Sequence, residues 1–260
     1  VGFFANRNHF GTLMLMALAC AVFMLRQQES HTKRQSILRL SGVFGVAIIT
    51  FVVLLVNGSD AGILLFFPVI VASALLYRNV KVPGILLVSG LIVLAAVLAI
   101  GTINASALNA LLHRNDILQQ DRSAIWMTTL RLIATSFPFG TGLGSFAVSY
   151  ANLEDPMKVT PIFVNHAHND YLEVCNDLGL LGVSAVILFL LWWGRRAVQI
   201  WTATDSLAKL GVVMSSVVIV HSVVDYPART AAISALLAAA LVLMVRHDPG
   251  QSASAAEVGR

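Results

Sequence analysis

Residues 37–56 read ILRLSGVFGVAIITFVVLLV, a stretch in which Arg39 carries the only charge. Its apolar residues do not alternate with polar ones, which favours a helix over a barrel strand of roughly 10 residues. A helix of about 20 residues is about 30 Å long and matches the hydrocarbon core of a bilayer. The stretch therefore predicts a transmembrane helix.

Six further stretches have the same apolar character. They are residues 10–25, 61–77, 82–101, 179–194, 210–225 and 231–245. Several are short for a hydrocarbon core of about 30 Å, so we expect some of the helices to extend into their flanks. The predicted fold class is all-α, a polytopic membrane protein with about seven transmembrane helices and one long structured loop.

The composition supports this prediction. Of the 260 residues, 57% are hydrophobic and 12% are charged, whereas a soluble domain has about 25% charged residues. The lipid bilayer is therefore a predicted partner. The net charge of +4 comes from short basic clusters between apolar stretches, which is typical of membrane orientation and does not favour nucleic-acid binding. Cys20 and Cys175 predict no disulfide framework.

Basic residues gather in alternate loops, at 26–39, 78–81 and 195–209. The positive-inside rule places these loops and the C-terminus in the cytoplasm, and hence the long loop on the outer side. That loop contains seven of the thirteen acidic residues and three of the seven histidines. The predicted organisation is four transmembrane helices in 1–101, the outer loop in 102–178, three transmembrane helices in 179–246 and a disordered cytoplasmic tail in 247–260.

The outer loop contains two local patterns. Between Ile125 and Phe137, an apolar stripe recurs at three- and four-residue spacing and predicts an amphipathic helix that Pro138 ends; its residues are Trp126, Leu130, Ile133 and Phe137. The following segment, Gly140-Thr141-Gly142-Leu143-Gly144, is dense in glycine. It does not fit a phosphate loop, because no strand precedes it and no Gly-Lys-Ser/Thr follows. A tight turn at the membrane surface is the better interpretation.

His168-Asn169 is the strongest catalytic candidate, because histidine exchanges protons near neutral pH and an adjacent amide can bind a sugar hydroxyl or orient the ring. The alternative is a surface histidine with local hydrogen bonds. His166 and His168, with Asp170 and Glu173, could also form half a metal site. Their spacing is loose and no second Cys/His cluster exists, so no metal or other cofactor is predicted.

Arg122 opens the amphipathic helix, where its guanidinium group can bind a phosphate with two hydrogen bonds and the helix start also favours an anion. The alternative is an ion pair with Asp121 or another acid of the loop. His221 and Asp225 lie one turn apart near the outer end of a predicted membrane helix. We interpret them as a structural pair that steadies the loop.

The order of the motifs resembles a known family. His168-Asn169, followed after nine residues by Gly179-Leu180-Leu181-Gly182, resembles the signature of O-antigen ligases, whose superfamily includes polysaccharide polymerases and O-linked oligosaccharyltransferases. Segments 2–10, 138–146 and 221–227 are similar to other segments of this family. The resemblance covers nearly the whole chain, which we expect to be the C-terminal portion of a longer protein.

The resemblance implies a metal-independent, inverting transfer of a glycan from undecaprenyl diphosphate, on the periplasmic face of the bacterial inner membrane. The acceptor would be a hydroxyl of lipid A core, of a growing glycan or of a protein. It implies that His168 is the catalytic base and that Arg122 binds the diphosphate. Further expected substrate-binding residues are Asn169, Arg7, Arg131, Tyr171 and Glu173. Expected site-supporting residues are Gly142, Gly144, Gly179, Gly182, His221 and Asp225.

One position departs from the family. Ser59-Asp60 stands where the family usually has Ser-Arg, and an aspartate repels a phosphate. Either Arg7 or Arg131 substitutes, or the acceptor differs, or the enzyme is impaired. The alternative functions are a transporter or flippase of lipid-linked glycans, which would need polar residues along a path through the membrane, and a non-catalytic scaffold.

Overall fold

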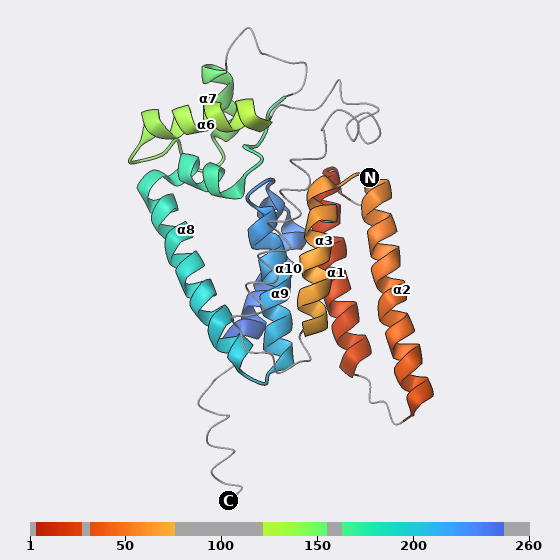
Figure 1. Ribbon diagram of the computed structural model, residues 1–260. Helices are drawn as coiled ribbons and strands as arrows, with labels where there is room; N and C mark the ends of the chain where they lie inside the picture. The colour runs from red at the N-terminus through yellow and green to blue at the C-terminus, as the bar shows by residue number, and fades with distance from the viewer. Residues whose placement is uncertain (1–3, 28–31, 76–121, 155–162, 247–260) are drawn as a thin grey trace, which may run out of the picture.

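The computed structural model describes residues 4–27, 32–75, 122–154 and 163–246 (Figure 1). The elements of this part are eight α-helices and one short 3-10 helix, so the all-α prediction is confirmed for it. They are α1 (Arg7–Gln27), α2 (Lys33–Asn57), α3 (Asp60–Leu75), α6 (Arg122–Ser136), α7 (Phe146–Leu153), α8 (Asp170–Thr202), α9 (Ser206–His221), η2 (Pro227–Arg229) and α10 (Ala231–Arg246).

Three helices are long and apolar enough to cross a membrane, in the spans Arg7–Leu25, Lys33–Asn57 and Asp170–Thr202. The helices α3, α9 and α10 are apolar but shorter. The predicted stretch 82–101 lies outside the described residues, so the prediction of seven spans is not tested. As expected, some helices extend into the flanks of the short apolar stretches, namely α1 and α8, whereas α9 and α10 have only 16 residues each.

Local signals in the sequence set the helix ends. Thr32 begins α2 with a capping box, in which its side chain accepts from the backbone of Gln35 while the Gln35 side chain accepts from Thr32. The helix ends at Gly58, which adopts a left-handed conformation that glycine tolerates without strain. Asp205 begins α9 by accepting hydrogen bonds from two backbone N–H groups.

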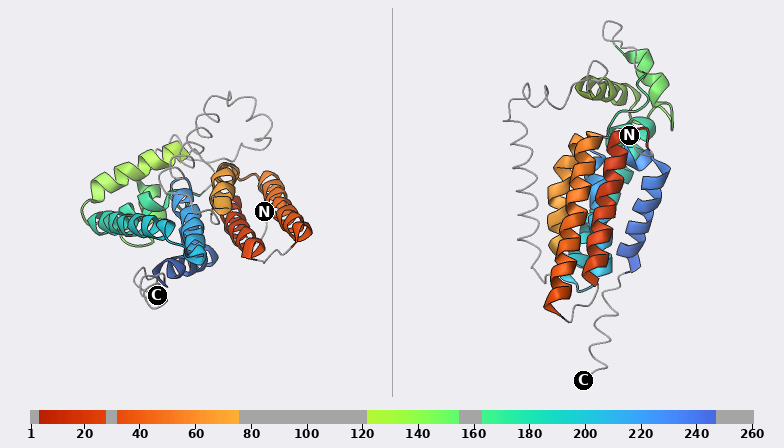
Figure 2. Two further views of the ribbon diagram at one scale, coloured as in Figure 1. Left: turned by 60° about the horizontal axis from the view of Figure 1, so that its bottom comes forward. Right: turned by 90° about the vertical axis from the view of Figure 1, so that its right-hand side faces the viewer.

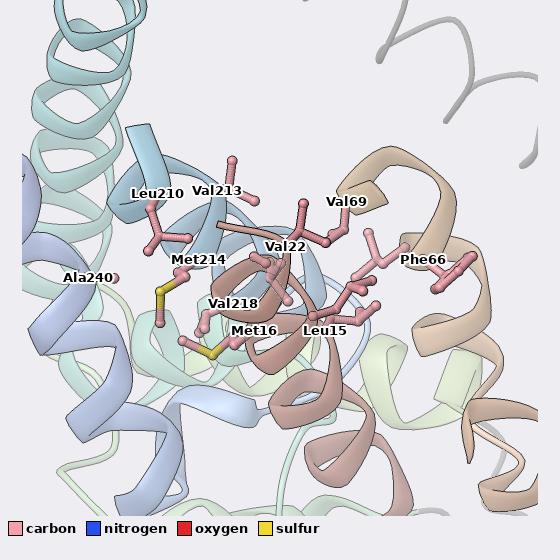
Figure 3. Packing of buried hydrophobic residues seen from close by; sticks show 14 of the residues in the cluster. Leu15, Met16, Val22, Phe66, Val69, Leu210, Val213, Met214, Val218 and Ala240 are labelled. Atoms are coloured by element: carbon pink, nitrogen blue, oxygen red, sulfur yellow. The ribbon is translucent and has the colours of Figure 1, made fainter. Parts of the chain in front are cut away.

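The helices α1, α2, α3, α9 and α10 stand side by side, with α1 packed against α2, α3 and α9 (Figure 1). In α1, Leu15, Leu18, Ala19 and Val22 are fully buried, at the spacing that places residues on one helix face. Figure 3 shows part of this core, in which side chains of α1 meet those of α3 and α9. The outward face of α2 is apolar and exposed, as a lipid-facing surface requires.

The helix α8 bends at Gly179, which has φ 54° and ψ −128°. Its second part stands at a tilt beside α9 and α10, while its first part lies across one end of the bundle (Figure 1). The helices α6 and α7 lie beyond this first part, and α7 projects farther out (Figure 2). We call this end of the bundle the loop end. The start of α1 also lies at this end, because Asn6 and Asn8 donate to Asp225 in the turn after α9, and the end of α2 joins it there through the hydrogen bond from Asn57 to the Arg7 carbonyl.

The predicted amphipathic helix is confirmed as α6, but its buried face differs from the predicted one. Ile125 and Leu132 are buried against α7 and the segment 164–167, whereas Leu130 and Phe137 of the predicted stripe are exposed. Apolar residues occupy two faces of α6, and the contact with Phe146 and Tyr150 of α7 decides which face is covered.

Candidate functional site

The histidine loop, residues 163–169, leads into α8 and is held by α8 itself. The Asn169 side chain caps the helix by accepting a hydrogen bond from the Leu172 N–H at 3.0 Å. The Glu173 carboxylate accepts from the Ala167 N–H at 2.8 Å and pairs with His166 Nδ1 at 2.8 Å. His168 has φ 50°, a left-handed conformation that is uncommon for residues other than glycine. The loop is therefore fixed, and it holds the histidine in a strained backbone.

Asp225 brings together the two residues predicted to be catalytic. Its carboxylate is fully buried, in the turn between α9 and α10. His168 Nδ1 lies 3.2 Å from Asp225 Oδ1, and Arg122 Nη2 lies 3.8 Å from Asp225 Oδ2. Arg122 also donates from Nη1 to the Val224 carbonyl at 2.7 Å. A histidine before α8 and an arginine at the start of α6 thus meet at one carboxylate.

This pairing determines which nitrogen of His168 can accept a proton. A carboxylate accepts hydrogen bonds, so the Nδ1 atom that faces Asp225 carries the hydrogen of the ring. The lone pair of the neutral ring is then on Nε2. The side chain is 16% exposed. His168 is therefore oriented as a general base would be.

The N-terminal end of α1 completes the surroundings of Asp225. Asn6 Nδ2 donates to both carboxylate oxygens at 3.2 Å, and Asn8 Nδ2 donates to Oδ2. The backbone N–H of Tyr226 donates to Oδ1 at 3.0 Å, and His9 Nε2 lies 3.9 Å from the same oxygen. The carboxylate therefore receives several donors in a place that excludes water.

These donors determine the charge of Asp225. Burial by itself would raise the pKa of this carboxyl group, but the hydrogen bond from His168, the charge of Arg122 and the hydrogen bond from Asn8 outweigh it. Together they hold the pKa well below its usual range. Asp225 is therefore a permanent negative charge behind His168 and Arg122.

Tyr226 packs against three histidines. Its ring centroid lies 4.7 Å from that of His9, 4.2 Å from that of His166 and 5.1 Å from that of His168. Burial raises the pKa of its hydroxyl group. The Tyr226 ring packs against the imidazole of His168. Packing as well as hydrogen bonding therefore positions this imidazole.

A second cluster of charges holds the first part of α8 onto the α9–α10 turn. The Arg229 guanidinium faces three carboxylates, at 3.6 Å from Asp170, 3.2 Å from Glu173 and 3.5 Å from Asp177. Asp170 also accepts from the Ser222 hydroxyl at 2.7 Å. Because the acids follow one another along α8, one arginine fixes the helix that carries the histidine loop.

The expected direct pair of His221 and Asp225 is not what the structure shows. The helix α9 ends at His221, whose Nδ1 lies 2.8 Å from the hydroxyl oxygen of Thr12 in α1. Asp225 lies in the turn beyond and meets Asn6, Asn8 and His168 instead. The chain leaves the helix after His221, so the one-turn spacing does not bring the two side chains into a hydrogen bond.

The glycines predicted to support the site lie at a close backbone contact. Gly179 approaches Pro138, since a Cβ atom there would lie 2.1 Å from the Pro138 oxygen. At Gly182 a Cβ atom would lie 2.3 Å from the Val174 oxygen. Gly142 and Gly144 have positive φ angles of 98° and 75° but open space around them. Gly179 and Gly182 thus permit close packing of the backbone, and Gly142 and Gly144 permit the turn.

The other predicted residues differ in placement. Three polar side chains already bond within the chain: Asn169 Nδ2 donates to the Val223 carbonyl at 2.7 Å, the Tyr171 hydroxyl donates to the Ile219 carbonyl at 2.6 Å, and Glu173 faces Arg229. Arg131 is exposed on α6, and Arg7 starts α1. Whether these five residues contact substrate stays a prediction.

Asp60 lies in the first turn of α3 and is exposed. An acidic side chain there interacts favourably with the positive end of the helix dipole. The neighbouring Ser59 is buried and donates to Asn8 Oδ1 at 2.9 Å. Ser59 thus joins the start of α3 to the asparagine that contacts Asp225, while Asp60 suits the first turn of this helix.

Sequence reasoning missed Asn6, Asn8, His9, Tyr226 and Arg229 as parts of the site. Asn6 to His9 form a polar run directly before an apolar helix, and this was the available signal. Asp121, the first ion-pair alternative for Arg122, lies outside the described residues. Within the described ranges, no group of three or more His, Cys, Asp or Glu side chains is placed to hold a metal ion.

A comparison with protein families finds one match. A family model described as O-Antigen ligase matches residues 45–187, which is more than half of the chain. The match includes α3, α6, α7, His168 and the bend in α8, and it ends before Asp225. No curated protein and no solved structure matches the chain.

Proposed function

Because the chain belongs to the O-antigen ligase family, whose members are membrane glycosyltransferases, we propose that it transfers a glycan from undecaprenyl diphosphate to an acceptor hydroxyl. The reaction takes place on the periplasmic face of the bacterial inner membrane. The observation that carries the proposal is the convergence of His168 and Arg122 on the buried Asp225.

His168 acts as the general base. Its Nε2 takes the proton of the acceptor hydroxyl while the hydroxyl oxygen attacks the anomeric carbon of the donor sugar. The bond between this carbon and the phosphate oxygen breaks, and the diphosphate leaves with the electron pair. Asp225, at 3.2 Å from Nδ1, stabilises the imidazolium ion that forms.

Arg122 binds the leaving diphosphate. Its side chain is 34% exposed, and the hydrogen bond to the Val224 carbonyl together with Asp225 fixes the guanidinium group at the start of α6. Negative charge that develops on the leaving group meets a positioned cation and the positive end of a helix dipole. The imidazole and the guanidinium are held on the same carboxylate, so base and anion site are close enough to act on one sugar.

Arg7 takes the place of the arginine that this family usually has after Ser59. The Arg7 guanidinium lies beside Gly58, at 3.5 Å from the position of a Cβ atom there. A cation at this turn compensates for Asp60. Arg131 is a secondary contact to the donor. Asn169, whose amide bonds within the chain, positions the histidine loop, and Glu173 and Tyr171 hold the first part of α8.

The test is glycan transfer in cells by the full-length protein carrying His168→Ala or Arg122→Ala. We expect each substitution to abolish transfer at normal protein abundance. Arg195→Ala, at an exposed position of α8, is the control for the arginine, and normal abundance and thermal unfolding of His168→Ala exclude a folding defect as the cause of its loss of transfer. Full transfer by both His168→Ala and Arg122→Ala would refute the assigned roles.

A second measurement separates the enzyme from a flippase or a scaffold. Purified protein with the lipid-linked donor and an acceptor should release undecaprenyl diphosphate, and His168→Ala should not. The described part of the chain favours the enzyme, because His168, Arg122 and Asp225 gather at the loop end rather than along a path through the bundle. Transport without release of the diphosphate would contradict the proposal.

A further inference from the structure

The glycine turn, residues 137–145, exposes large apolar side chains. Phe139 is 87% exposed and Leu143 is 78% exposed, and the turn lies between the end of α6 and the start of α7. Two large exposed apolar side chains on one turn are a feature of surfaces that contact a partner or a membrane.

Backbone hydrogen bonds fix the turn onto the bend of α8. The Leu180 N–H donates to the Pro138 carbonyl at 2.8 Å, and the Gly142 N–H donates to the Asp177 carbonyl at 2.9 Å. The close contact of Gly179 with Pro138 adds to this attachment. The position of Phe139 along the bundle is therefore set by α8.

The surface of α8 directly after the bend is apolar and exposed. Leu180, Leu181, Ile187, Leu188 and Leu191 all belong to the exposed apolar residues, and they lie in a helix that is long and apolar enough to span a membrane. The backbone of the glycine turn contacts α8 at the loop end of this surface, where the Leu180 N–H donates to the Pro138 carbonyl. Because the surface of a spanning helix faces acyl chains, the exposed side chains of the turn lie next to the level at which this lipid-facing surface begins.

The lengths of the helices agree with this placement. After the bend, the first charged residue of α8 is Arg195. The rise from Gly179 to Arg195 is about 24 Å, compared with about 30 Å for the hydrocarbon core. The helices α9 and α10, with 16 residues each, are also about 24 Å long. The hydrocarbon core is thus about 6 Å thicker than these helices are long, so it can extend to a segment at the end of the bundle.

We propose that the glycine turn is a membrane anchor, which inserts Phe139 and Leu143 among the acyl chains of the leaflet at the loop end. The partner is a lipid surface. The anchor fixes the end of α6 opposite to Arg122 and thereby sets the depth of this helix at the bilayer surface. This inference rests on the apolar surface and does not depend on the proposed glycan transfer.

The test measures the depth of a nitroxide spin label in vesicles of phosphatidylethanolamine and phosphatidylglycerol. Cys20→Ala and Cys175→Ala remove the two native cysteines, and Phe139→Cys introduces the labelling site. Collision with oxygen, which concentrates among acyl chains, is compared with collision with a water-soluble nickel chelate. Leu181→Cys on α8 is the control inside the bilayer, and Val148→Cys is the matched apolar and exposed control on α7.

We expect the ratio of oxygen to nickel collisions at position 139 to shift from the value at 148 toward the value at 181. A label at 139 with the water-exposed ratio of 148 would overturn the proposal. So would a label protected from both reagents, because this result indicates a protein contact. Leu143→Cys gives an independent measurement should the Phe139 variant not fold, and the same ratio is expected there.

Discussion

Replacing Asp225 by asparagine tests how the site is held together. The substitution keeps the shape of the side chain but removes its charge. An amide NH2 group, which donates hydrogen bonds, replaces one carboxylate oxygen. It then faces groups that also donate, among them Asn6, Asn8 and Arg122. The hydrogen bond from His168 Nδ1 loses its charged acceptor, so the ring is no longer held in one tautomer.

The contacts give the size of the effect. Hydrogen bonds to a charged group contribute about 1.5–3 kcal/mol each. Since an asparagine retains one acceptor oxygen, we expect a loss of unfolding free energy of about 2–4 kcal/mol. We expect transfer per folded molecule to fall by about 10²- to 10⁴-fold, equivalent to about 3–5 kcal/mol in the barrier, because the base loses both its orientation and the charge that stabilises the imidazolium ion.

The assay combines transfer in cells, protein abundance and thermal unfolding of the purified protein in detergent. Asp205→Asn is the matched control. Asp205 caps α9 at its other end by accepting from the Leu207 and Ala208 N–H groups, and asparagine caps a helix equally well. This control should therefore change neither stability nor transfer.

One result would refute this reasoning. If Asp225→Asn transferred glycan at the wild-type rate while its abundance was normal, the charge behind His168 would have no part in the reaction. A loss of stability with unchanged transfer per folded molecule would reduce Asp225 to a structural residue.

Three further predictions concern charge and backbone. Because the pKa of Asp225 is lowered, its contribution to stability is complete above its unfolded pKa of about 3.9 and is lost as the pH falls through the folded value. The wild type should therefore keep its higher Tm relative to Asp225→Asn as the pH falls from about 8 to 5, and a loss of this difference within that range would contradict the prediction. Gly179→Ala should destabilise the protein by more than about 3 kcal/mol, since its Cβ atom would meet the Pro138 oxygen. The control is Gly194→Ala in the same helix, where a Cβ atom meets open space; it should leave the Tm unchanged or raise it slightly. Arg229→Gln should lower the free energy of unfolding by about 3–5 kcal/mol, because it leaves the carboxylates of α8 without their cation. An unchanged Tm would exclude this role, and Arg195→Gln is the control at an exposed position.

Much of the local structure could be predicted from the sequence. Apolar stretches without charge set where the helices lie, because a backbone in lipid must satisfy its hydrogen bonds internally. Pro138 and the glycines after it predicted the end of α6 and the turn that follows. The stripe of α6 that is buried could not be predicted, because two of its faces are apolar and only the packing of α7 distinguishes them.

The candidate site was predictable only in part. His168 and Arg122 stood out because their chemistry and their local positions, before one helix and at the start of another, are readable from the residues themselves. The spacing of residues in a sequence indicates neighbours only within one helix. The prediction therefore paired Asp225 with His221, on the assumption that both belong to the same helix. The structure ends α9 at His221 and turns Asp225 toward α1 and the histidine loop.

The sequence by itself determined that this is a helical membrane protein, and it singled out a histidine and an arginine in its polar segment, whose roles in glycan transfer are proposals. Only the tertiary structure decided that these two residues share one buried carboxylate, that Asn6 and Asn8 supply donors to it, and that Arg229 holds three acids of α8. The physical reason is that composition and periodicity act over a few residues, whereas the site joins segments that are distant in the chain. Their meeting depends on how the helices pack.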